Sequence, residues 1–195
     1  MKLTILDQVH TFDSGANGTE KIIEKINSTT SEKALFFSHL VIDGQEVYED
    51  HEEYMLAKKG EIKEIEAIVK TVQELIDDVL VSLDDYTNRA IPEIKALVHE
   101  FYQTPSENAW LTLTYLLDGV DWIYQSLKKI DQLKHSIVNW GEFVKSIAVF
   151  EMELPNLMEA IENKDSILIA DIIQYEILPQ FEIINGETKK NFAMK

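Results

Sequence analysis

The segment from 109 to 130, AWLTLTYLLDGVDWIYQSLKKI, is the most apolar long stretch of the chain and constrains its fold most strongly. Its apolar residues recur at alternating steps of four and three, the spacing of a helix that packs lengthwise on other helices. They are Ala109, Leu113, Leu116, Val120, Ile123, Leu127 and Ile130. A second stripe, formed by Leu111, Tyr115 and Trp122, points in another direction. Because a helix that is apolar on two faces needs neighbours on both sides, we predict the central helix of a multi-helix domain.

The rest of the chain after residue 71 also has helical periodicity, with apolar residues three or four apart over 72–83, 94–101, 140–161 and 167–184. Pro92 predicts a kink or break near residues 88–91, and Pro179 is expected to interrupt the last helix. The sequence Thr104-Pro-Ser-Glu107 has the pattern of a capping box and is predicted to start the central helix. That helix is expected to end near 134–136.

Two further signals concern the last helix. Asp165 is predicted to cap its start, and Asn185-Gly186 is predicted to stop it. A proline follows an aliphatic residue at both Ile91 and Leu154, so the helices could be two duplicated hairpins. Chance similarity between amphipathic helices explains the same pattern, and the sequence does not decide between the two.

The first 70 residues have shorter periodic segments. Strands are predicted at 2–6, 34–42 and 45–48, the last two joined by an Asp43-Gly44 turn, with helices at 20–28 and 50–59. Thr19 is a suitable N-cap for the first helix. Residues 62–71 can be read as a strand or a helix; β-branched residues and the break at Gly60 favour the strand. The resulting order is β-α-β-β-α-β.

The predicted fold class is therefore α+β. We expect a small α/β domain at 1–70, a helical domain resembling a four-helix bundle at 71–186, and a flexible polar tail at 187–195.

The charge balance is strongly acidic, with 35 acidic and 18 basic residues and a net charge of −17. Both halves contribute, since residues 1–70 carry −6 and residues 71–195 carry −11. Such a field repels phosphate backbones and anionic lipids, and the lysines form only isolated pairs. We expect no nucleic-acid or membrane partner. The acidity serves solubility or complements a basic protein.

The chain has no cysteine, no apolar run long enough to span a membrane and no segment resembling a signal peptide. We therefore expect a cytoplasmic protein. Arg89 is the only arginine, which leaves few options for binding a carboxylate or phosphate through two parallel hydrogen bonds.

Motifs for catalysis or cofactor binding are weak. The glycine-rich loop at 13–19 matches neither nucleotide-binding spacing, and acidic residues flank it. His51-Glu52-Glu53 lacks the second histidine of a zinc-protease helix, and no histidine has a glutamate three residues before it. We expect no cofactor and no metal, and we lean against an enzyme.

Asp118, Gly119 and Asp121 are the most unusual polar positions, because they interrupt the apolar central helix. A helix-interior glycine costs about 1 kcal/mol relative to alanine, so a close helix approach is expected to compensate. The two aspartates could bind a cation or a basic side chain, although a solvated face is the more ordinary explanation.

Three functions remain. The leading expectation is a non-enzymatic interaction module, an adaptor or chaperone-like protein, whose partner is another protein or a second copy of the chain. The first alternative is a small-molecule or metal-binding protein with a carboxylate site between helices that uses Asp118 and Asp121. The second is an acidic mimic of nucleic acid that inhibits a basic protein.

Overall fold

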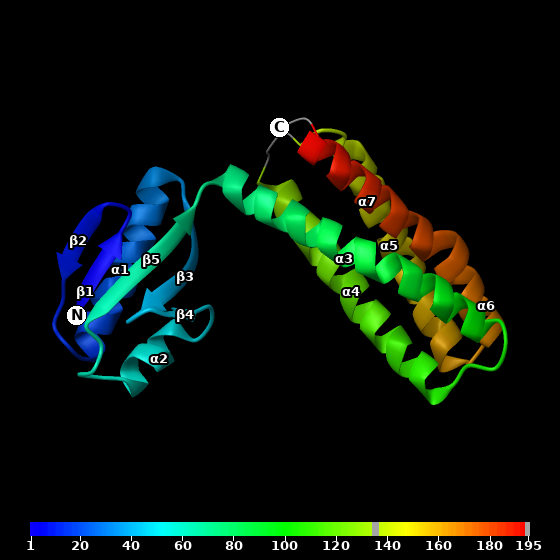
Figure 1. The fold of residues 1–195 in the computed structure, drawn as a ribbon, viewed down its shortest axis with the longest axis horizontal. Helices are drawn as coiled ribbons and strands as arrows, with labels where there is room; N and C mark the ends of the chain where they lie inside the picture. Colours follow the sequence, from blue (N-terminus) through cyan, green and yellow to red (C-terminus); the bar gives the residue numbers. More distant parts are fainter. Residues whose placement is uncertain (134–136, 194–195) are drawn as a thin grey trace. The chain divides into compact units, whose positions relative to one another are not determined.

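The structure is a computed structural model that describes residues 1–133 and 137–193. The chain divides into two compact units, Met1–Leu75 and Ile76–Lys195 (Figure 1). The first contains a mixed sheet with two helices and the second is helical, so the predicted α+β class is confirmed. The predicted end of the central helix near 134–136 and the last two residues of the predicted tail lie outside the described residues.

The sheet of the first unit has five strands in the order β2-β1-β5-β3-β4. The strands are β1 (Lys2–Ile5), β2 (Gln8–Thr11), β3 (Phe36–Ile42), β4 (Gln45–Val47) and β5 (Glu64–Lys70). β1 and β5 pair in parallel, and the other neighbours are antiparallel. The ambiguous segment 62–71 is thus a strand, at the centre of the sheet. Strand β2 was not predicted, because four residues carry too little periodicity to indicate a strand.

The helices of this unit are α1 (Ala16–Lys33) and α2 (His51–Ala57). Helix α1 begins earlier than predicted, so Thr19 is not its N-cap. Gly15 takes that position, and Thr19 is buried inside the helix, where its N–H donates to the carbonyl oxygen of Gly15 at 2.9 Å.

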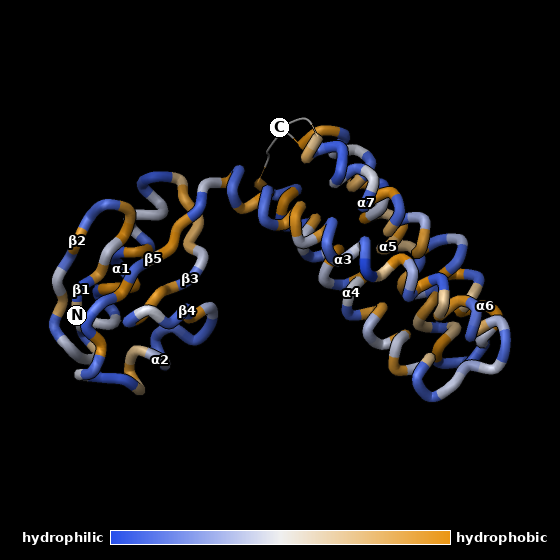
Figure 2. Tube along the Cα trace, viewed as in Figure 1, coloured by the Kyte–Doolittle hydropathy of each residue, from blue (hydrophilic) through white to orange (hydrophobic). Residues whose placement is uncertain are grey.

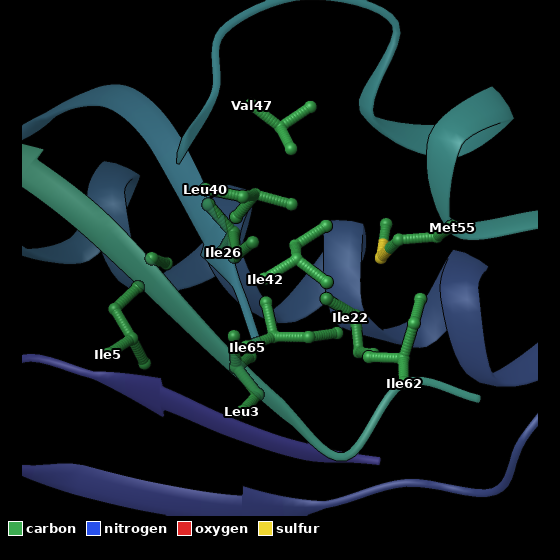
Figure 3. Close-up of a cluster of buried hydrophobic side chains, with 11 residues drawn as sticks. Leu3, Ile5, Ile22, Ile26, Leu40, Ile42, Val47, Met55, Ile62 and Ile65 are labelled. Carbon is green, nitrogen blue, oxygen red and sulfur yellow. The ribbon is translucent and has the colours of Figure 1, made fainter. Parts of the chain in front are cut away.

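Both helices contribute to one hydrophobic core. Alternate residues of three strands, Leu3 and Ile5, Leu40 and Ile42, and Ile65 and Ala67, are buried against Ile22 and Ile26 of α1 and Met55 of α2. In Figure 3 the labelled side chains of this core point toward one another from the sheet and from the two helices. The period of two along the strands therefore assigns one sheet face to the core.

The second unit contains α3 (Val72–Phe101), which starts just before it, α4 (Glu107–Gln132), α5 (Trp140–Glu162) and a final continuous helix. That last helix is made of α6 (Ser166–Ile172), a π-helical turn η1 (Ile173–Ile177) and α7 (Leu178–Ala193). Ring contacts join α3 to α4 (Phe101–Trp110), α5 to α7 (Phe150–Phe181) and α3 to α7 (Tyr86–Phe181), and Tyr124 of α4 hydrogen-bonds Glu151 of α5. The four helices thus close into the predicted bundle.

The predicted seam of the central helix is confirmed, since all seven of its apolar residues are buried in α4. Helices α3 and α5 both contact α4, but the expectation that a neighbour also covers the second stripe is wrong. Of the second stripe, Leu111 is 49% exposed, Tyr115 62% and Trp122 39%. Figure 2 shows hydrophobic and hydrophilic residues alternating along each helix of the bundle, as expected for helices with one buried face.

The helix caps agree with the sequence in part. Asp165 accepts a hydrogen bond from the backbone N–H of Leu168 at 3.0 Å and caps α6 as predicted. The predicted capping box at Thr104 is wrong, because the N-cap lies two residues later. Ser106 caps α4, and its hydroxyl oxygen accepts a hydrogen bond from the N–H of Ala109 at 3.1 Å.

Prolines interrupt the helices less than predicted. Helix α3 is not broken at Pro92, and α5 runs through Pro155. At Pro179 the backbone instead changes to the π-helical turn η1. Proline lacks an N–H and clashes with the carbonyl four residues back, here that of Tyr175, and a wider turn relieves both effects.

The predicted helix stop at Asn185-Gly186 is wrong, because α7 continues to Ala193. Residues 187–193 are therefore helical rather than part of a flexible tail. Tertiary contacts explain the difference: the Asn139 side chain donates to Glu187 at 2.8 Å, and Asn191 exchanges hydrogen bonds with the backbone of Val138 at 3.2 Å.

Among the described residues, no helix combines the length and the hydropathy needed to cross a membrane.

Phe181 is fully buried and contacts both Tyr86 and Phe150, so it joins three helices. We expect Phe181→Ala to lower the free energy of unfolding by about 3–5 kcal/mol, because it removes buried apolar area and leaves a cavity. Urea denaturation followed by circular dichroism measures this. Met152→Ala, at an exposed position, is the control. A loss below about 1 kcal/mol for Phe181→Ala would contradict the assigned packing.

Glu187 links the ends of α5 and α7. The Lys190 ammonium, and then the Asn139 amide, hold the pKa of its carboxyl below the usual value. Because the folded-state pKa is lowered, this stabilisation is present above the unfolded pKa of about 4.3 and is lost as pH falls through the folded value. We expect Glu187→Gln to lower the melting temperature at pH 7. The difference from wild type should shrink below about pH 4 in a melting series; a constant difference would contradict this assignment.

Candidate functional site: a groove between α3 and α4

An open groove lies on the bundle surface between α3 and α4. It consists of two adjoining hollows of about 380 Å³ each, which share Tyr86 and Arg89 as lining residues. Helix α3 also contributes Asp85 and Glu93, and α4 contributes Tyr115, Leu116, Gly119 and Trp122. We call this surface the α3–α4 groove. All of it belongs to the second unit.

The α4 wall of the groove comes from the second apolar stripe of that helix. Tyr115 and Trp122 are seven residues apart and so lie on one face, with Leu111 one turn before Tyr115. The exposed fraction of each of the three side chains exceeds a third. Leu116, from the buried seam, forms part of the apolar floor. The groove thus presents aromatic surface to solvent.

Gly119 determines how closely the two helices approach. A Cβ atom at this position would lie 1.5 Å from the hydroxyl oxygen of Tyr86 and 2.5 Å from the ring carbon that bears it. The Tyr86 ring also packs edge-on against Trp122, with centroids 5.5 Å apart. The glycine in the central helix is therefore explained by the close approach that the sequence predicts. Tyr86 contacts this glycine and lines both hollows.

The Tyr86 hydroxyl is a protonated donor. Partial burial raises the pKa of the phenol, the Arg89 charge lowers it, and the Asp118 charge raises it. The hydroxyl forms no hydrogen bond with any other described residue. A ligand in the groove could therefore accept a hydrogen bond from it without displacing an internal partner.

Charged residues line only the α3 wall. Asp85, Arg89 and Glu93 follow one another at steps of four, so they form an exposed row along one helix face. The Arg89 Nε donates to the main-chain carbonyl oxygen of Asp85 at 3.1 Å, which orients the side chain. Within the described part of the chain, the guanidinium forms no ion pair. Its other nitrogens are free to bind a partner.

Of the three candidate residues of the sequence, only Gly119 lines the groove. Gly119 lies in the groove, Asp118 acts on Tyr86 only through its charge, and Asp121 is exposed and accepts a hydrogen bond from Gln125 at 3.4 Å. No cluster of three or more histidine, aspartate and glutamate side chains in residues 1–133 and 137–193 is arranged to hold a metal.

Sequence reasoning missed Tyr86 and Glu93 as site residues, and it noted Arg89 only as the single arginine. Spacing alone could have grouped Arg89 and Glu93 with Asp85, because these three residues share one helix face. Their position opposite Tyr115 and Trp122 depends on how α3 and α4 pack, which periodicity does not specify.

Two other motifs have structural explanations. Gly18 lies inside α1, where a Cβ would come within 1.9 Å of the Asp13 carbonyl oxygen, so this glycine permits a close backbone contact. His51 places its Nε2 2.9 Å from the Val47 carbonyl oxygen and its ring against Phe37, 5.2 Å between centroids. Both residues are accounted for by packing in the first unit.

A family model described as "Domain of unknown function (DUF8042)" matches residues 78–187. This match covers more than half of the chain, and the chain belongs to this family. The matched region includes every residue of the α3–α4 groove. No curated protein and no solved structure matches the chain.

Gly119→Ala should lower the free energy of unfolding by about 1–3 kcal/mol, because the added methyl group displaces Tyr86. Gly186→Ala is the matched control, since it lies inside α7 with no atom within 4 Å of the added Cβ. That variant should be stabilised by up to about 1 kcal/mol through helix propensity. Urea denaturation measures both. Equal effects of the two substitutions would contradict the close approach at Gly119.

Proposed function

We propose that this member of the DUF8042 family is a protein-interaction module that binds a segment of another protein in the α3–α4 groove. The observation that carries the proposal is the exposure of Tyr115 and Trp122, together with Leu111, on one face of the central helix. Contiguous exposed apolar surface of this kind is typical of interaction sites in proteins that remain soluble.

The residue types support a protein ligand. Tyrosine, tryptophan and arginine are the residues most enriched where interface binding energy concentrates, and the groove contains two tyrosines, a tryptophan and the only arginine. Tyrosine and tryptophan bury a large apolar area and lose few rotatable bonds on binding. Each wall therefore offers anchors of the type that hold a partner side chain.

The groove is also formed in advance of binding. Its walls are helices of 30 and 26 residues, held together by the Tyr86–Trp122 and Phe101–Trp110 ring contacts. Rigid walls reduce the entropy that binding costs. Helix α3 is acidic as a whole, with seven acidic and two basic residues including those of the groove, so a partner with basic residues is favoured.

A photo-reactive phenylalanine at position 115 tests this in lysate of the source cells. We expect a protein to be cross-linked there, and not when the same group replaces Tyr175, which is equally exposed but outside the groove. Mass spectrometry then identifies the attached segment.

Tyr115→Ala should weaken binding of that identified segment at least tenfold, because about 1.4 kcal/mol or more is lost when an anchor is removed. Tyr175→Ala should leave binding unchanged. If no protein attaches at 115 in excess of 175, or if both alanine variants bind equally, the proposed function is wrong. Isothermal titration calorimetry gives the affinities.

A further inference from the structure

We infer that the occupant of the α3–α4 groove is an amphipathic helix of a different protein, with basic, acidic and basic side chains at four-residue steps placed opposite Asp85, Arg89 and Glu93. This inference rests on the proposed function, which holds for any protein segment, and specifies the partner's chemistry.

The spacing of the charged row matches a helix. Residues four apart on α3 are separated by about 6 Å along its axis, so the row spans about 12 Å. A second helix aligned with α3 repeats its own side chains at the same interval. Because the row reads acidic, basic, acidic in both directions, a basic-acidic-basic partner matches it in either orientation. Helices that pack lengthwise cross at about 20°, so alignment persists over these two turns.

All three charges are available. Asp85, Arg89 and Glu93 are exposed, and none forms an ion pair with another described residue. The Arg89 fork can bind a carboxylate through two parallel hydrogen bonds, which a lysine at this position could not do. A partner carboxylate thus pairs with Arg89, and basic side chains one turn to either side pair with Asp85 and Glu93.

The α4 wall determines where the partner's apolar face lies. Its lining residues, among them Tyr115, Leu116 and Trp122, carry no charge. A partner helix whose charged edge faces α3 therefore directs its apolar side chains toward α4. Apolar anchors provide affinity in this arrangement, and the charged row selects the register, because like charges brought opposite each other are repelled.

A second copy of the chain does not supply such a helix. Nowhere in the 195 residues do a basic, an acidic and a basic residue follow one another at four-residue steps; the one pair of basic residues eight apart, Lys25 and Lys33, has Thr29 between them. The partner is consequently another protein.

Two synthetic 20-residue helical peptides test the inference on the full chain. They share one apolar face of leucines and a tryptophan and differ only in their charged edge, which is Lys-Glu-Lys or Glu-Lys-Glu at four-residue steps. Both are capped at their ends and matched in helicity by circular dichroism. Fluorescence anisotropy should show the Lys-Glu-Lys peptide binding at least tenfold more tightly.

The charge-swapped variant Asp85→Lys/Arg89→Glu/Glu93→Lys should reverse this preference. Glu159→Lys is the control, because it changes the net charge by the same amount outside the groove. It should leave the preference as in wild type. Circular dichroism verifies that both variants are folded, and their substitutions lie at exposed positions.

The outcomes separate the inference from the proposed function. Equal binding of the two peptides, or a preference that the swapped variant retains, overturns the charge register and leaves the groove as a binding site. If neither peptide binds but the segment cross-linked at position 115 does, the inference of a helical basic-acidic-basic partner is overturned and the proposed function is not. Failure of both peptides and of cross-linking overturns the proposed function too. A dimer in sedimentation velocity that Tyr115→Ala dissociates overturns the assignment to a different protein.

Discussion

Burial of the α4 seam is the interaction on which the helical unit depends. Its seven apolar residues, at steps of three and four, are buried inside the bundle, and each such side chain removed from water contributes about 1–3 kcal/mol. Once this face is buried, the rotation of α4 about its axis is determined. Every other residue of the helix then has an assigned direction, including the second apolar stripe.

That second stripe links packing to the proposed function. Four helices are enough to enclose one face of α4 but leave Leu111, Tyr115 and Trp122 at the surface. Of these, Tyr115 and Trp122 line the groove beside α3. The Tyr86–Gly119 contact brings the two helices close enough for these aromatic residues and the charged row of α3 to border the same groove. In the proposed complex, the apolar area and the charge pattern act on the same ligand: the apolar area provides affinity and the charge pattern selects the register.

Local sequence signals were reliable for a buried helix face, a strand and one helix cap, but not for the caps expected at Thr19 and Thr104. The helical seam of α4, the strand at 62–71 and the Asp165 cap follow from periodicity and from backbone groups within a few residues. Signals failed where distant contacts compete with them. Asn185-Gly186 does not end α7, because Glu187 and Asn191 bond to residues at the start of α5, and Pro179 is accommodated by a π-helical turn. Strand β2 exists through pairing with β1 rather than through its own four residues.

The sequence by itself determined the α+β class, the buried face of α4 and the acidic character of the chain, because periodicity and composition do not depend on partners in space. It also marked Gly119 as a place of close approach. Only the tertiary structure decided which residue approaches there, that Asp118 and Asp121 do not line the α3–α4 groove, and that Arg89 lies opposite exposed aromatic rings. The reason is physical: a helix's own period specifies which residues share a face, whereas the neighbour across that face depends on how whole helices pack.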